Sequence, residues 1–152
     1  MNLEQKIMTD IKAAMLARDT GKLEALRAIK AAILLEKTRG TAFVETISEE
    51  EEIKLLQKMV KQRRESAEIF RSQGRADLAQ TEESQVSVIE AYLPKQLDIE
   101  DVRAVIADLI KNIDAKSIKD MGKVMGEASK QLMGKADNKT IAAIVKELLA
   151  GN

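Results

Sequence analysis

The chain has 152 residues, and its 25 lysines and arginines are balanced by 25 aspartates and glutamates, so its formal net charge is zero. This balance does not favour polyanion binding through overall charge, but it leaves room for a local basic patch. Cysteine and histidine are absent, which excludes thiolate zinc sites, cysteine nucleophiles and histidine acid–base catalysis. Three aromatic residues, Phe43, Phe70 and Tyr92, are too few for a platform on which bases stack.

Neither a membrane span nor a secretory signal is expected. Uninterrupted apolar runs, such as Ala31 to Leu35, fall far short of the roughly 20 residues that cross a bilayer. The first residues lack the apolar region of a signal peptide. We therefore expect a cytoplasmic protein without a membrane partner.

The N-terminal residues predict a helical hairpin. Apolar residues recur every four positions from Leu3 to Met15, which places them near one helix face. We expect Thr20 to cap a second helix, whose apolar face runs from Leu23 to Ile33. The short link between the two helices favours a hairpin.

A long third helix is predicted to begin after Ser48, which forms a capping-box sequence with Glu51. The run of four glutamates in its first turn fits the helix dipole better than a metal site. Gly74 is expected to end this helix, and a fourth helix should run from about Arg75 to Leu93.

Pro94, the one proline, disfavours helical geometry at the preceding residue and is the expected boundary between two units, residues 1–94 and 95–152. Beyond it, Asp98, Ser117 and Asp137 are each placed to cap a short helix with an apolar face. The predicted fold is all-α, with an N-terminal helical hairpin plus long helices, followed by a small C-terminal three-helix bundle.

The third helix carries a basic stretch, most of which we expect to be solvated and paired within the helix, as Arg64 would be with Glu68. Arg63 differs because it falls on the apolar stripe of that helix. A buried guanidinium is retained when it is paired, so we expect Arg63 to form a structural ion pair with Glu82 or another carboxylate between helices.

A second basic stretch is the candidate nucleic-acid interface. Lys119, Lys123 and Lys130 fall on one side of a helical wheel, with Lys116 close by, and Gly126 lies among them. The missing side chain of Gly126 would let another backbone approach. The stripe is either an ordinary solvated face or a polyanion contact, and a phosphate could also bind the free N–H groups at the start of the same helix.

Several stretches in order give the chain a family resemblance. They are residues 26–33 (LRAIKAAI), 61–63 (KQR), 74–78 (GRADL), 92–97 (YLPKQL), 120–126 (DMGKVMG) and 134–137 (GKAD). Together they cover essentially the whole chain. The sequence resembles the YqeY family, also called the GatB/YqeY domain family.

The resemblance implies an all-helical protein whose C-terminal bundle is similar to the tail of GatB, a subunit of the tRNA-dependent amidotransferase. In that enzyme the tail helps to hold tRNA, and the catalytic domains lie elsewhere. The family label is carbon–nitrogen ligase activity with glutamine as amido-N-donor. We expect neither that activity in the isolated chain nor any catalytic residue, metal or cofactor.

Three functions remain open at this point. The first is a monomeric accessory protein that binds tRNA through its backbone phosphates. The second is a protein-interaction module that docks on amidotransferase or synthetase subunits through exposed apolar positions such as Leu34 or Leu55. The last is an enzyme with a carboxylate or Ser–Lys site.

Overall fold

A computed structural model describes residues 1–151 of the chain, and these residues form seven α-helices and one 3-10 turn, without a strand. The all-α prediction is confirmed. The structure divides into two compact units, of which the first is Met1–Leu93 and the second begins at Pro94. No helix in the described range is long and apolar enough to cross a membrane.

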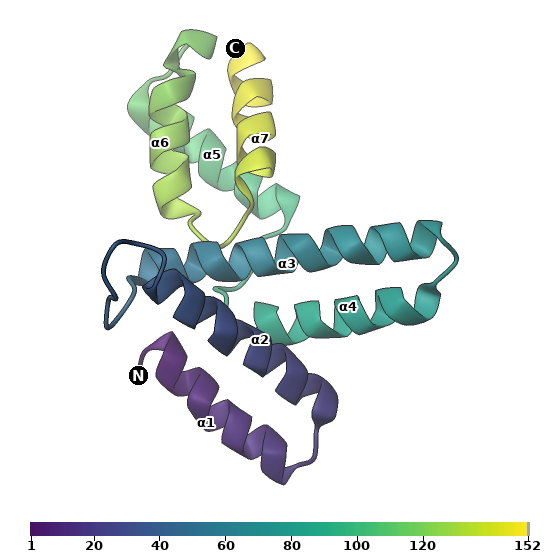
Figure 1. The fold of residues 1–152 in the computed structure, drawn as a ribbon. Helices are drawn as coiled ribbons and strands as arrows, with labels where there is room; N and C mark the ends of the chain where they lie inside the picture. The colour runs from purple at the N-terminus through teal and green to yellow at the C-terminus, as the bar shows by residue number, and fades with distance from the viewer. Residues whose placement is uncertain (152) are drawn as a thin grey trace. The chain divides into compact units, whose positions relative to one another are not determined.

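The first unit consists of two helical hairpins, drawn from purple to teal in Figure 1. Helices α1 (Leu3–Leu16) and α2 (Thr20–Lys37) form the shorter hairpin, and α3 (Glu49–Ser72) and α4 (Ala76–Glu90) form the longer one. Helix α2 packs against α1, its partner in the shorter hairpin, and against α4 of the longer hairpin. The largest fully buried side chains of their shared core are Ile7, Leu26, Ile29, Leu56 and Ile89.

The start of α3 follows the predicted capping box. The Ser48 hydroxyl accepts a hydrogen bond from the backbone N–H of Glu51 at 3.1 Å, and the Glu51 carboxylate accepts one from the backbone N–H of Ser48 at 2.8 Å. The predicted cap of α2 is wrong by one residue. Asp19 is the N-cap, because its carboxylate accepts from the Lys22 amide at 3.1 Å, and Thr20 is the first helical residue.

Gly74 stops α3 as predicted: the helix ends at Ser72, Gln73 is its C-cap, and Gly74 is the next residue. Gly74 has a φ of 73°, a left-handed value that a residue without Cβ adopts at low cost. The amide of Arg75 donates to the carbonyl of Phe70, and the Gly74 amide donates to that of Arg71. These two bonds form a Schellman motif, which satisfies the last carbonyls of the helix and turns the chain into α4.

The second unit is a bundle of α5 (Ile99–Ile113), α6 (Met121–Gln131) and α7 (Asn138–Ala150), with the 3-10 turn η1 (Ile118–Asp120) before α6. Asp98 and Asp137 cap α5 and α7, as predicted. The fully buried residues of this core are Val102, Ile106, Val124, Ala128, Leu132, Ile141 and Val145. Each helix therefore buries its own apolar stripe in the bundle.

Candidate nucleic-acid interface

The lysine stripe begins in η1 rather than in an α-helix. The predicted helix from Ser117 starts with this 3-10 turn, and α6 itself starts at Met121. Lys123, Gly126 and Lys130 therefore lie on α6, whereas Lys119 lies in the turn before it. Because a 3-10 turn winds at 3.0 residues per turn, Lys119 is rotated away from the line predicted for a continuous α-helix.

The side chains of the stripe face solvent. Lys116, Lys119, Lys123 and Lys130 are all exposed, whereas Val124, Ala128 and Leu132 of the same segment are buried in the bundle core. The bundle therefore leaves the lysines on the outer side of η1 and α6, where a ligand in solvent can reach them.

Two glycines lie on the exposed side of α6. A Cβ placed on Gly122 or Gly126 would meet no atom within 4 Å. Both residues are exposed, so their missing side chains leave open space above the helix backbone rather than room for a packed neighbour. An approaching group can come closer to the helix axis here than elsewhere on α6.

Three backbone N–H groups at the start of this segment already have acceptors within the chain, so these three are not free donors for a phosphate. The Asp120 carboxylate accepts from the backbone N–H of Lys116 at 2.9 Å and from that of Ser117 at 3.4 Å. The Ser117 hydroxyl accepts from the amide of Lys119 at 3.3 Å. Two of these three donors are thus taken by a carboxylate of the chain itself.

The charge of Asp120 is held in place by its surroundings. Hydrogen bonds from the Lys116 and Ser117 amides, together with the positive charges of Lys123 and Lys116, lower the pKa of this carboxyl below its usual value. Asp120 therefore remains ionised at neutral pH and partly offsets the neighbouring lysines.

The remaining cations of the stripe have weak local partners. The Lys116 Nζ lies 3.7 Å from the Asp114 carboxylate, and the Lys130 Nζ lies 3.8 Å from that of Glu127. Both pairs are exposed, and such pairs contribute about 0–1 kcal/mol. In the described part of the chain Lys119 forms no ion pair within 4.0 Å, so the lysines can exchange these partners for a ligand at low cost.

The wider segment from residue 111 to 146 contains eight lysines and four carboxylates. This segment therefore has an excess of positive charge, although the chain as a whole is neutral. Lysine is a compact point charge without the planar fork of arginine, so this region suits phosphates along a backbone better than recognition of a particular base.

Arg63 lies between helices, as predicted, but its partner is Gln85 rather than Glu82. The Nε of Arg63 donates to the side-chain oxygen of Gln85 at 2.9 Å, and Nη1 donates to the carbonyl of Met59 at 3.3 Å. Gln85 lies three positions after Glu82, nearly one helical turn further along α4, and it is Gln85 that reaches this half-buried guanidinium. The contact between α3 and α4 is therefore a hydrogen bond to a neutral amide.

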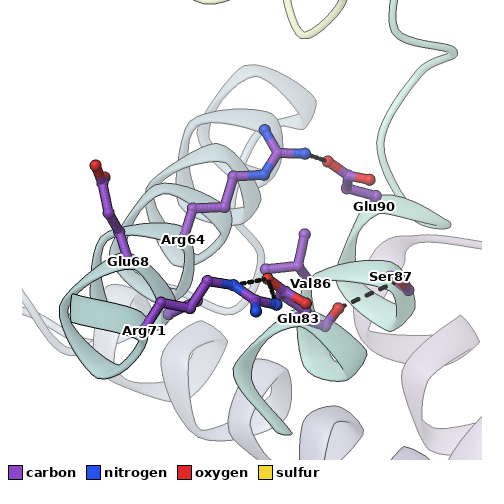
Figure 2. Close-up of a pocket in the computed structure, with 8 residues that line it drawn as sticks. Arg64, Glu68, Arg71, Glu83, Val86, Ser87 and Glu90 are labelled. Carbon is purple, nitrogen blue, oxygen red and sulfur yellow. Dashed lines mark hydrogen bonds and ion pairs between the residues drawn. The ribbon is translucent and has the colours of Figure 1, made fainter. Parts of the chain in front are cut away.

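Beside this contact, a row of ion pairs joins α3 to α4. Figure 2 shows Arg64 and Arg71 of α3 reaching Glu90 and Glu83 of α4. The Arg71 Nη2 lies 2.6 Å from the Glu83 carboxylate. The expected pairing of Arg64 with Glu68 is wrong, since Arg64 turns to the opposite helix.

A cavity of about 450 Å³ lies between the two helices at this row. Ala67 and Val86 contribute apolar surface to it, and the paired arginines and glutamates line its sides. This row was not predicted, because Arg64 was expected to pair with an acid on its own helix. The seven-residue spacing of Arg64 and Arg71, matched by Glu83 and Glu90, was a usable signal, because an antiparallel hairpin turning at Gly74 aligns the two sets.

The described residues offer no cluster of three or more His, Cys, Asp or Glu side chains that could hold a metal ion. The four glutamates at the start of α3 occupy its first turn, and the Glu51 carboxylate forms part of the capping box. The lysine stripe is therefore the candidate site with the clearest ligand chemistry.

Comparison with known proteins places the chain in a family. The YqeY family model, described as Yqey-like protein, matches residues 4–149, and the chain belongs to this family. One relative is the altered inheritance of mitochondria protein 41, mitochondrial, of Clavispora lusitaniae (strain ATCC 42720). The two are 33% identical over 116 residues, which is 74% of this chain and 65% of the relative. The match thus spans about two thirds of the relative's length.

Proposed function

We propose that this YqeY-like protein is an accessory tRNA-binding protein that contacts backbone phosphates through the lysine stripe and performs no catalysis of its own. The observation that carries the proposal is the exposed side of η1 and α6, which carries both the lysines and two glycines with open space above them. The choice of tRNA among polyanions rests on the resemblance to the GatB tail. The proposal places a monomeric protein in the cytoplasm.

The expected binding mode is weak and tolerant of sequence. Few cations take part, and no aromatic platform is available for stacking bases. Phosphate contacts of this kind give dissociation constants of about 10⁻⁴–10⁻⁶ M near physiological salt. A duplex read through its backbone and shape is the compatible form of RNA.

A salt series tests the proposal. Fluorescence anisotropy with labelled bulk tRNA should give a plot of log affinity against log salt with a slope of about −3. Each phosphate neutralised on a duplex contributes about −0.9, and the lysines of the stripe would neutralise about three phosphates. The absence of binding at low salt, or a slope near zero, would contradict phosphate-dominated binding.

A second candidate function is docking on a protein, such as an amidotransferase or synthetase subunit. Leu34 and Leu35 near the end of α2 are 57% and 72% exposed, and Phe43 of the following loop is 63% exposed. Leu55 does not belong to this surface, because it is half-buried against the core of the first unit. A pull-down from lysate that survives high salt and is lost with Leu34→Ser and Phe43→Ser would favour this function.

A further inference from the structure

The core of the first unit ends part of the way along the longer hairpin. The last α3 residue in that core is Val60, and the first α4 residue is Val86. Both helices continue past this level to the turn at Gly74, as Figure 1 shows for α3 and α4. We call residues 63–85 the α3–α4 arm.

We propose that the α3–α4 arm opens locally as one cooperative segment while the core of the first unit stays folded. Two kinds of observation carry the inference, namely how little apolar surface the arm buries and which polar contacts close it.

Little apolar surface stabilises the arm. Its buried side chains are Ala67 and Ala79, and Phe70 and Leu78 are only half-buried. Hydrophobic stabilisation grows with the apolar area removed from water, and alanine contributes one methyl group. The core below the arm instead contains Leu56, Ile89 and other large side chains.

The contacts that close the arm are polar and mostly exposed. Arg63 bonds to Gln85 near the base, and Arg71 bonds to Glu83 further out. The side chains of Arg71 and Glu83 are 52% and 48% exposed, and salt screens such a pair. Arg64 and Glu90 form a third bridge, also at the base.

The cavity beside these bridges adds little apolar contact between the helices. Six of its eight lining side chains are charged or polar, and its apolar lining consists of Ala67 and Val86. Segments with few buried apolar contacts open with lower free energy than the core, and often do so as a unit. Opening would give the first unit a surface that rearranges on a partner without global unfolding.

Hydrogen–deuterium exchange of the full chain tests this inference. Amides from Arg64 to Phe70 and from Leu78 to Ser84 should exchange at least tenfold faster than those of Leu56 and Ile89, and at rates similar to one another. Rates equal to those of the core would overturn the proposal. Fast exchange confined to the turn on either side of Gly74 would also overturn it, because it would show fraying of helix ends.

Charge variants identify what closes the arm. Arg71→Glu should accelerate exchange across the whole arm about fivefold, and adding Glu83→Arg should restore the parent rates. Arg103→Glu, which breaks a comparable exposed pair with Glu147 in the second unit, is the matched control and should leave the arm unchanged. Equal exchange in the arm of the Arg71→Glu variant and of the control would contradict closure by the ion pair.

Discussion

The phenolic hydroxyl of Tyr92, just beyond the end of α4, donates a hydrogen bond to the carboxylate of Asp10 on α1. The bond joins residues 82 positions apart and ties the last turn of the first unit to its first helix. Tyr92 is also the one tyrosine of a chain without tryptophan, so its ionisation can be observed without interference.

Tyr92 should stay protonated at pH values where an ordinary tyrosine ionises. Burial raises the pKa of this phenol, and the hydrogen bond to Asp10 and the negative charge of that residue raise it further. Absorbance at 295 nm should therefore show no titration near pH 10 in the folded chain, but should show one there in urea. Titration near pH 10 in the folded protein would contradict this partly buried hydrogen bond.

The raised pKa of Tyr92 also determines how the stability of the protein depends on pH. The folded state holds the Tyr92 proton more tightly than the unfolded state does, so its contribution is complete below about pH 10 and is lost as the pH rises further. In Tyr92→Phe this alkaline loss should be smaller than in the parent, as measured by urea unfolding at a series of pH values. If the variant loses as much stability at alkaline pH as the parent, groups other than Tyr92 cause the loss.

Arg18→Gly should stabilise the protein by about 0.5–1 kcal/mol. Arg18 has a φ of 54° and occupies the position after the cap of α1, where glycine adopts the left-handed conformation without strain. Arg27→Gly in the interior of α2 is the matched control and should destabilise by about 1 kcal/mol. Urea unfolding measures both, and two changes of the same sign would contradict this explanation.

Glu4→Ala should destabilise the protein more than Lys37→Met does. Lys37 is the one buried charged residue of the described chain, and its ammonium group pairs with the Glu4 carboxylate. Removing Glu4 leaves a buried charge without its partner, at a cost of about 1–3 kcal/mol, reduced because Glu4 is itself 39% exposed. Methionine in place of Lys37 removes the buried charge. A larger loss of stability in Lys37→Met than in Glu4→Ala would contradict this prediction.

The helices could be predicted because their signals are local. The Ser48 capping box, the caps at Asp98 and Asp137 and the stop at Gly74 each depend on neighbours a few residues away. The predicted start of α6 was wrong because it, too, was based on local signals alone. Ser117 and Asp120 form a valid capping box, but the sequence does not distinguish a 3-10 turn from the first turn of an α-helix.

The tertiary partners were less predictable. Arg63 was placed correctly between helices, but the choice between Glu82 and Gln85 depends on how α4 is rotated against α3. Arg64 could pair with Glu68 on its own helix or with an acid on the next helix. The register of the hairpin places Glu90 within its reach. The burial of Lys37 was not predicted, because its partner Glu4 lies 33 positions away in the sequence.

The second unit should fold alone if the fragment begins at residue 94. The Gln96 side chain donates to the carbonyl of Gly134, and the Leu97 amide donates to that of Lys135 at 2.9 Å. Leu97 also packs against the bundle core. A fragment of residues 98–152 lacks these contacts and should melt at a lower temperature than 94–152, which matters in a unit of marginal size.

Circular dichroism of the two fragments measures this difference. Cooperative melting of residues 94–152 is the expected result, and its absence would contradict an autonomous second unit. Equal melting temperatures would show that Gln96 and Leu97 do not stabilise the bundle.

The affinity of charge-reversed protein for tRNA at low salt tests the central claim most directly. Lys119→Glu, Lys123→Glu and Lys130→Glu together should abolish binding without unfolding the bundle, because all three side chains are exposed. The matched control reverses Lys54, Lys58 and Lys61, which are exposed on α3, and changes the net charge equally. The control should keep most of the parent affinity. Equal affinities of the stripe variant and the parent, or equal losses in the two variants, would contradict a tRNA contact at the lysine stripe.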